Sequence, residues 1–350
     1  MTSERFRQLS PATRVALVLI ALGLILLLLR LSIFSSASLV VLSRFWPLLL
    51  VGFGLDLLGR RPHPSLSYGM LSVFLLLALM LLGPALGLGG RLRAESLNVP
   101  LAGTRSADIE LDLSAAPATV SVLTDSPDLL RADITDRGRV ILNTRGNDDK
   151  TVRLAERRRF FGFGSEGRRS EGGRWQVGLS PTVLLELSVD SGSGPTDLDL
   201  EGLQLTDLEL ESGSGSTEAV LPASRDRYDV AWDGGSGATR LSVTDGAAFD
   251  FEGDGGSGAL ELTFGGDVAA ELELDGGSGP MTFTLPANTE ARFEVEDSGS
   301  GALQLSERFR RVSGDEDDDE GAWETTGFAG AERAIIIRIQ DSGSGSITVQ

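Results

Sequence analysis

The chain has 350 residues and a net charge of −19, from 31 basic and 50 acidic residues, and it contains no cysteine. Without cysteine, disulfides, thiol catalysis and cysteine–zinc sites are excluded. The single histidine, His63, lies in the short segment RPHP, so a catalytic triad or a histidine-based metal site is also excluded. Residues 1–93 carry nine arginines against Glu4 and Asp56, whereas residues 94–350 are strongly acidic. This distribution predicts a membrane-like head joined to an acidic, soluble body.

Three apolar runs in residues 1–93 predict three transmembrane helices, at about 15–34, 39–58 and 68–88. Each run has about 20 residues, which is enough to cross a hydrocarbon layer about 30 Å thick. The first run is longer than the apolar part of a signal peptide and two more runs follow it, so we expect an uncleaved helix. Five arginines on one side of the predicted spans against four on the other favour a cytoplasmic N-terminus and an extracytoplasmic body.

Asp56 is the one acidic residue within a predicted span. Because a carboxylate in hydrocarbon is costly, such a residue marks a functional site by default. However, Asp56 also lies four and five residues before Arg60 and Arg61, which allows a salt bridge near the helix end. The sequence favours the salt bridge and leaves a partner-helix or proton-linked role open.

A Gly-Ser-Gly motif recurs seven times in residues 186–350, at intervals of 21 or 22 residues with one final interval of 44. A short fixed period is typical of solenoids, and the residues flanking each motif alternate between apolar and polar, as in strands with one buried face. We therefore predict a membrane head of three transmembrane α-helices and an all-β body, a β-solenoid with coils of 21–22 residues. The predicted repeat corners are Gly192, Gly194, Gly213, Gly215, Gly235, Gly237, Gly256, Gly258, Gly277, Gly279, Gly299, Gly301, Gly343 and Gly345.

We expect these glycines to shape corners, because glycine adopts positive φ angles without steric cost. Calcium-binding nonapeptide repeats have a period of nine and an aspartate where Leu260 stands, and phosphate loops need a following helix where a strand is predicted. An acidic residue stands two positions before each first glycine, and we expect it to accept N–H groups of its own turn. A ladder of these carboxylates that holds divalent cations stays open as an alternative, with Asp233, Asp254 and Asp275 as its candidate ligands, and no cofactor is expected.

Residues 94–185 lack the Gly-Ser-Gly period but are predicted to form strands that cap the first coil. They contain a basic and aromatic insertion at 157–175. A solvated hairpin loop is its simplest interpretation, contact with anionic lipid headgroups is a second, and nucleic-acid binding fits least well. The residues predicted to contact the membrane surface are Arg157, Arg158, Arg159, Phe160, Phe161 and Phe163.

A second insertion, at about 307–330, contains six consecutive acidic residues from Asp315 to Glu320. Like charges in a run repel one another and favour a solvated loop. The chain then continues as AIIIRIQDSGSGSITVQ and ends at Gln350. We expect the last strand to be an open sheet edge, which could pair with a partner strand or with a second copy to form a homo-oligomer.

Two segments carry a family resemblance. The first predicted span followed by RFWPLLLVGFGLDLLGRR (Arg44–Arg61) resembles the LiaI/LiaF-type transmembrane region, in which Trp-Pro opens a Leu/Gly-rich helix that ends in arginines. Arg174–Pro222 is similar to toastrack-type β-repeat domains, with a tryptophan-led strand, a Gly-Ser-Gly turn and the strand LQLTDLEL. The resemblance implies a bacterial cell-envelope protein that senses or relays envelope stress and has no catalytic residues. Some relatives restrain a membrane histidine kinase.

The sequence thus predicts a non-enzymatic, multi-pass membrane protein that regulates an envelope-stress response through contacts with lipid and with a histidine kinase or another envelope protein. The alternative is a structural or adhesive surface stalk that self-associates or binds wall polymer. An enzyme is a third hypothesis, because some β-helices cleave polysaccharides with paired carboxylates. The acidic residues of this chain are explained by their place in the repeat, which argues against catalysis.

Overall fold

The computed structural model describes residues 46–51, 73, 75–76, 93–113, 115–136, 140–156, 173–224, 226–314 and 319–350. The chain divides into two units, Met1–Arg91 with Arg159–Arg168, and Leu92–Arg158 with Arg169–Gln350. In the first unit, residues 47–51 are helical. The helices found within the described residues are too short or too polar to cross a membrane. The three predicted spans lie almost wholly outside these residues.

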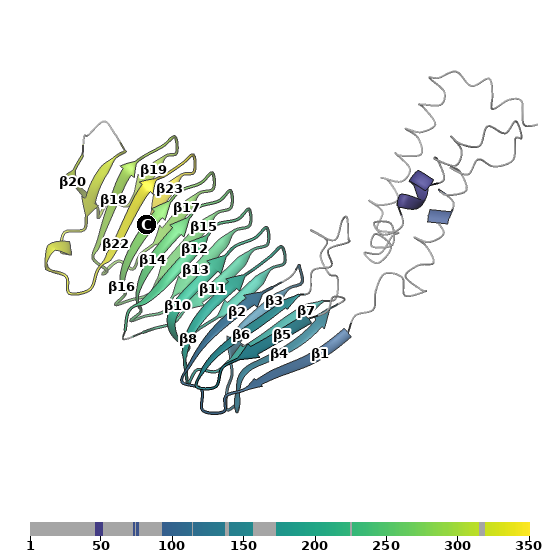
Figure 1. Ribbon diagram of the computed structural model, residues 1–350. Helices are drawn as coiled ribbons and strands as arrows, with labels where there is room; N and C mark the ends of the chain where they lie inside the picture. The colour runs from purple at the N-terminus through teal and green to yellow at the C-terminus, as the bar shows by residue number, and fades with distance from the viewer. Residues whose placement is uncertain are drawn as a thin grey trace, which may run out of the picture. The chain divides into compact units, whose positions relative to one another are not determined.

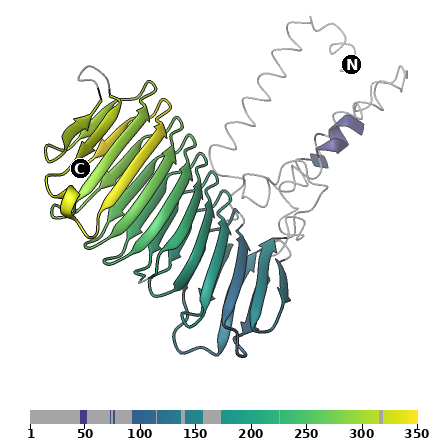
Figure 2. The ribbon, with the colours of Figure 1, turned by 60° about the vertical axis from the view of Figure 1, so that its left-hand side comes forward.

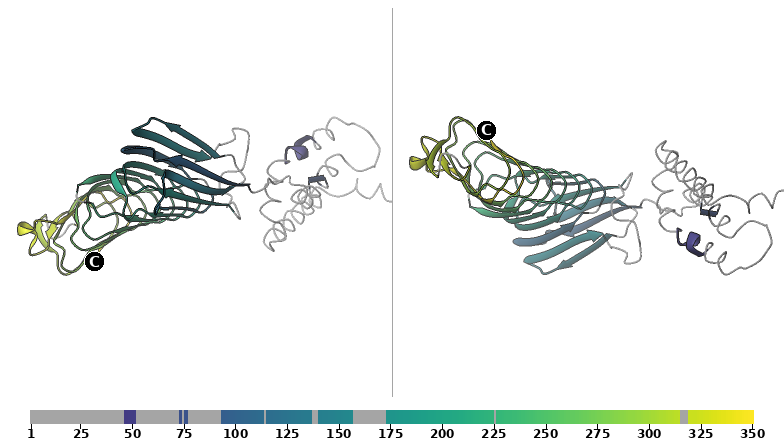
Figure 3. Two further views of the ribbon diagram at one scale, coloured as in Figure 1. Left: turned by 90° about the horizontal axis from the view of Figure 1, so that it is seen from below. Right: turned by 90° about the horizontal axis from the view of Figure 1, so that it is seen from above.

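The second unit, the β-body, consists of two sheets whose strands stack side by side along its length (Figures 1 and 2). Figure 3 shows the strands of the two sheets and the turns that join them from below and above. Sheet A contains, in spatial order, β1 (Arg93–Pro100), β4 (Asp128–Asp136), β7 (Arg174–Leu179), β3 (Ala118–Val122), β9 (Thr196–Asp199), β11 (Thr217–Leu221), β13 (Thr239–Val243), β15 (Leu260–Phe264), β17 (Met281–Thr284), β23 (Ile347–Val349) and β19 (Leu303–Leu305).

Sheet B faces sheet A across the core. It contains, in spatial order, β20 (Arg310–Ser313), β21 (Gly321–Glu324), β18 (Ala291–Asp297), β22 (Ile335–Asp341), β16 (Ala269–Asp275), β14 (Ala248–Asp254), β12 (Tyr228–Asp233), β10 (Gln204–Glu211), β8 (Leu184–Asp190), β2 (Ser106–Asp112), β6 (Asp149–Glu156) and β5 (Val140–Arg145). A single turn of 3-10 helix, η2 (Phe328–Gly330), lies between β21 and β22.

The parallel pairing of the strands reproduces the repeat period. Leu208 of β10 pairs with Val230 of β12, 22 positions later, and Val230 pairs in turn with Phe251 of β14, 21 positions later. Each such step advances the chain by one coil, which contributes one strand to each sheet. The prediction of an all-β body is confirmed.

Alternating side chains fill the space between the sheets, because successive Cβ atoms of a strand point to opposite faces. In β12 the side chains of Tyr228, Val230 and Trp232 are buried and the residues between them are exposed. The Tyr228 ring stacks on that of Phe249 one coil along, with the ring centroids 5.8 Å apart. The same residues that alternate in the sequence therefore form one continuous core.

The C-terminal strands lie inside the sheets. β22 pairs with β16 on one side and with β18 on the other, and β23 lies between β17 and β19 in the same way. The prediction that the C-terminal strand is an open sheet edge is therefore wrong. Pairing of a second copy at this strand loses its basis, while self-association as such stays a prediction. The β16–β17 coil and the β18–β19 coil follow one another in the sequence, but the later strands β22 and β23 lie between them in space. As a result β23 has a neighbour on each side.

Antiparallel strands flank the parallel coils at both ends of sheet B and at one end of sheet A, whose other end is the parallel strand β19. At one end β4 pairs with β7, and β1 covers β4, while β5 covers β6 in sheet B. At the other end the hairpin β20–β21 covers β18. This hairpin lies within the predicted acidic insertion, so that segment contributes strands to sheet B. Antiparallel strands at a sheet end limit its extension by further parallel coils.

Candidate functional site: the acidic face of sheet B

The outer side of sheet B carries rows of carboxylates along β8, β10, β12, β14 and β16, which together contain no lysine or arginine. Parallel pairing brings acidic residues of successive coils side by side, as with Glu211 and Asp233 and then Asp233 and Asp254. All of these side chains are exposed or half-buried. We name this surface the acidic face; its carboxylates are those of Glu186, Asp190, Asp207, Glu209, Glu211, Asp229, Asp233, Asp250, Glu252, Asp254, Glu271, Glu273 and Asp275.

The outer side of sheet A has a different character. Its strands present aligned hydroxyl side chains, for example those of Ser242 and Thr263, which pair across β13 and β15. Arg240 forms ion pairs with Glu218 of the preceding coil at 3.6 Å and with Glu261 of the following coil at 3.0 Å. Negative charge is therefore concentrated on one side of the β-body.

Partial desolvation and repulsion between neighbouring carboxylates raise the pKa of two groups of the acidic face. Partial desolvation, followed by the charges of Asp190, Glu209 and Asp233, raises the pKa of Glu211. Partial desolvation and the charges of Asp229 and Glu209 raise the pKa of Asp207. Like charges on adjacent strands disfavour one another, so the face is a site where positive charge on a partner would be stabilised.

We expect Glu211→Gln to stabilise the folded protein at neutral pH, by roughly 0.5 kcal/mol or less because solvent screens an exposed carboxylate. A raised folded-state pKa means that the carboxyl favours folding when it is protonated, below its ordinary pKa of 4.5, and that this contribution is lost as the pH rises through the folded-state value. The gain should therefore be present at pH 7 and vanish below about pH 4. Denaturant unfolding at several pH values measures it.

The matched control for this change is Glu218→Gln on the outer side of sheet A, where the carboxylate forms an ion pair with Arg240. Removing this charge should give no gain at pH 7. An equal gain in both variants would contradict the repulsion along the acidic face. The gain from Glu211→Gln should also shrink in high salt.

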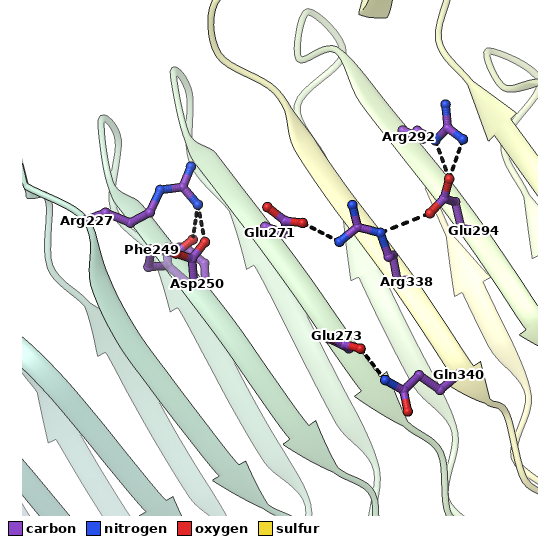
Figure 4. A network of polar contacts seen from close by, with 9 residues as sticks. All are labelled: Arg227, Phe249, Asp250, Glu271, Glu273, Arg292, Glu294, Arg338 and Gln340. Carbon is purple, nitrogen blue, oxygen red and sulfur yellow. Dashed lines mark hydrogen bonds and ion pairs between the residues drawn. The ribbon is translucent and has the colours of Figure 1, made fainter.

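Arginines from neighbouring strands relieve the charge where the acidic face meets β22 and β18 (Figure 4). Arg338 of β22 contacts the Glu271 carboxylate on one side, and its Nε donates to Glu294 at 3.0 Å on the other. The hydrogen bond to Glu271 is the main reason that the pKa of Arg338 is raised. Arg292 of β18 contacts Glu294 and also pairs with Glu324 at 2.6 Å. These contacts join β16, β22, β18 and β21 into one polar network.

The corner glycines form two columns, one for each glycine of the motif. A Cβ on Gly213 would lie 1.6 Å from the carbonyl oxygen of Gly192 in the preceding coil, and a Cβ on Gly258 would lie 1.8 Å from that of Gly237. The order along both columns places the Gly343–Gly345 motif between those at 277–279 and 299–301.

Close stacking explains most of these glycines better than backbone handedness does. Among the first glycines of the motifs, Gly192, Gly299 and Gly343 have positive φ angles, of 57°, 55° and 64°. The other four need glycine because carbonyl oxygens of the preceding corner lie so close to them. In the corners the N–H of the middle serine donates to the first-glycine carbonyl of the adjacent coil, as from Ser257 to Gly235 at 3.0 Å.

The acidic residues before the corners fall into two groups. Asp190, Asp297 and Asp341 each accept the N–H of their own first glycine, at 3.0, 2.9 and 2.7 Å, as expected for aspartate in a turn. These are the three corners whose first glycine has a positive φ. The cation candidates Asp233, Asp254 and Asp275 lie side by side in the ladder. Across the described residues, no group of three or more histidine or carboxylate side chains has the arrangement of a metal site.

Several predicted site residues lie outside the described part of the chain. They are Asp56 and the predicted membrane-contacting residues Arg157, Arg158, Arg159, Phe160, Phe161 and Phe163. Trp175, at the end of the predicted basic insertion, lies in β7 and is fully buried, and its indole Nε1 donates to Asp136 at 3.0 Å. This tryptophan therefore belongs to the core. The alternating run that begins at this residue is the sequence signal that could have placed it in the core.

Sequence reasoning missed the network around Arg338. Its partners lie 67 and 44 positions earlier in the chain, whereas neighbouring coils in the rest of the stack are 21 or 22 positions apart. The acidic face, by contrast, could be predicted from the sequence. Its carboxylates alternate with apolar residues along each strand, and they recur at intervals of 21 or 22 residues from one coil to the next.

Two family matches cover much of the chain. Residues 15–58 match the LiaI-LiaF-like transmembrane region, and residues 89–242 match the N-terminal domain of toast_rack. The first match covers the first two predicted spans. No curated protein matches the chain significantly.

Among solved structures, a candidate cell adhesion protein of Clostridium sporogenes is 14% identical, with 74% of this chain and 99% of that chain covered and a TM-score of 0.39. A candidate adhesin of Bacteroides fragilis is 11% identical, with 74% and 97% covered and a TM-score of 0.32. At these TM-scores the likeness carries no functional argument. The family matches agree with the resemblance found in the sequence: the chain carries a LiaI-LiaF-like transmembrane region followed by the N-terminal domain of toast_rack.

Proposed function

We propose that this protein is a non-enzymatic, membrane-anchored cell-envelope protein that senses or regulates envelope stress through protein–protein contacts made by its β-body. The family match at residues 15–58 supports the membrane anchor. The proposed site of contact is the acidic face, and this surface is the observation that carries the proposal. The predicted extracytoplasmic side of the body stays a prediction, which labelling of Ser257→Cys with an impermeant thiol reagent in intact cells would test.

The acidic face favours binding over catalysis for two reasons. Its carboxylates follow from the register of the coils, as the pairing of Asp229 with Asp250 and Asp250 with Glu271 illustrates. They also extend over five neighbouring strands, which suits a broad contact with a basic surface of another protein. Complementary charge speeds such association and makes it sensitive to salt.

The test is capture of partners from solubilised membranes with the full chain as bait. We expect a membrane histidine kinase to co-purify with the wild-type chain. Neutralising Glu209→Gln, Asp233→Asn and Glu252→Gln together should lower its recovery several-fold, because these exposed carboxylates contribute attraction to a basic partner.

The matched control variant carries Asp197→Asn, Glu218→Gln and Glu261→Gln on the outer side of sheet A, with the same change in net charge. It should retain the kinase. Equal loss in both variants would show a general charge effect and count against the acidic face. Recovery of nothing beyond copies of this chain or wall glycan would favour the structural or adhesive stalk instead.

A further inference from the structure

The C-terminal coil, β22 and β23, occupies a slot between two coils that follow one another directly in the sequence. The slot is walled by the β16–β17 coil on one side and the β18–β19 coil on the other. The corner glycines Gly277 and Gly299 of these walls are 22 positions apart. Elsewhere the same interval joins coils in direct contact, as between β10 and β12. The two wall coils are therefore as far apart in the sequence as coils that touch elsewhere in the stack. In the structure the C-terminal coil lies between them.

The two walls present the same register to the coil between them. Ile337 pairs with Leu272 on one side and with Phe293 on the other. In sheet A, Ile347 pairs in the same way with Met281 and Leu303. Both isoleucines are buried, at 1% and 2% exposure. The C-terminal coil is thus a separate unit inserted into an otherwise continuous stack.

Charge makes the slot selective for this coil. Glu271 projects from one wall and Glu294 from the other, and Arg338 lies between them in contact with both (Figure 4). A coil without a cation at this position would leave Glu271 without its arginine partner and Glu294 with Arg292 alone. The occupant that fits is a coil with the sequence of this C-terminus, whether from the same chain or from a second copy.

The C-terminal coil reaches its slot through one crossover segment, residues 325–334. Within sheet B, β21 and β22 are the two neighbours of β18, one on each edge of that strand. The segment that joins them must therefore pass around the start of β18. Thr325 and Ala291 hold it there: the Ala291 N–H donates to Thr325 Oγ1 at 2.9 Å, and the Thr325 N–H donates to the Ala291 carbonyl at 3.0 Å. The Glu290 carboxylate also accepts the Gly327 N–H at 3.0 Å.

We infer that the slot accepts the C-terminal coil of a second copy, so that two chains form a dimer by reciprocal exchange of β22 and β23. Every contact within the slot is kept in such a dimer, and the crossover segment alone changes its path. Exchange of an identical element is a route to dimers that needs no new interface. Anchoring in one membrane would bring the two bodies together. This inference rests on the strand order and not on the proposed regulatory function.

The experiment uses the natural absence of cysteine. Thr282 and Thr348 pair across β17 and β23, at one wall of the slot. Two full-length forms, Thr282→Cys and Thr348→Cys, carry tags of different size and are co-expressed, solubilised in detergent and treated with a short bis-maleimide. We expect a cross-linked product that contains one chain of each form.

The control forms are Glu218→Cys and Arg240→Cys, which pair across β11 and β13 on the same outer side of sheet A, within the unbroken stack. Side-by-side contact of two bodies would cross-link both pairs, whereas coil exchange cross-links only the slot pair. The double variant Thr282→Cys with Thr348→Cys checks that the folded chain places the two thiols within reach of the reagent. A mixed product no stronger than that of the control forms would overturn the inference.

Capture through one tag without cross-linker gives a second readout. The second form should co-purify, and co-purification should be lost when Arg338→Glu is introduced into both forms, because the slot then holds three carboxylates. Co-purification that is unchanged by Arg338→Glu would also count against exchange.

Discussion

Gly258→Ala is expected to lower the free energy of unfolding of the β-body by about 3 kcal/mol, the upper end of the usual range for overpacked sites. The added Cβ would lie 1.8 Å from the carbonyl oxygen of Gly237, a backbone atom that cannot move unless the whole corner moves. Each corner stacks on the next, so the strain spreads to both neighbouring coils. Denaturant unfolding of the solubilised chain, followed by far-UV circular dichroism, measures the change.

The matched control is Gly330→Ala in η2, where a Cβ would meet nothing within 4 Å. We expect a change within about 0.5 kcal/mol, as is usual for surface substitutions. Equal stability of the two variants would show that the corners do not stack as closely as described. The corner glycines would then be ordinary turn residues, replaceable at little cost wherever φ is negative.

Ile337→Ala is expected to destabilise the protein by about 2–5 kcal/mol, the range for large-to-small changes in a core. Ile337 lies in β22, is 1% exposed, and packs between the strands β16 and β18. Truncation leaves a cavity whose walls belong to two other coils and cannot collapse without breaking their pairing. The same unfolding measurement applies.

Its control is the adjacent residue, Ile336→Ala, whose side chain points to the outer side of sheet B and is half-buried. We expect a loss of about 1 kcal/mol or less, because less apolar surface leaves contact with the protein. The pair of variants tests both the internal position of β22 and its register, since a slip of one residue would exchange the two effects. Similar losses in both would contradict the register.

Local patterns were sufficient to predict the strands and the corners. The burial of Tyr228, Val230 and Trp232 follows from their alternation, because a strand has a side-chain period of two. The acidic face follows in the same way, since residues between the apolar positions must point outward. The sequence did not predict why most corner positions require glycine. Gly213 has a negative φ and owes its identity to the carbonyl oxygen of Gly192, a contact between coils.

The order of the coils was decided by the tertiary structure alone. The interval from Gly277 to Gly299 equals that between coils in direct contact. The spacing of the motifs therefore does not reveal that another coil lies between these two in space. The insertion depends on contacts of high sequence separation, such as Arg338 with Glu271 and Glu294. The β-repeat, its period and the outward position of its carboxylates could be predicted from the sequence, because they depend on the alternation of apolar and polar residues and on the spacing of the glycine motifs. The place of the C-terminal coil depended on which surfaces far apart in the chain fit together, and only the folded structure decides that.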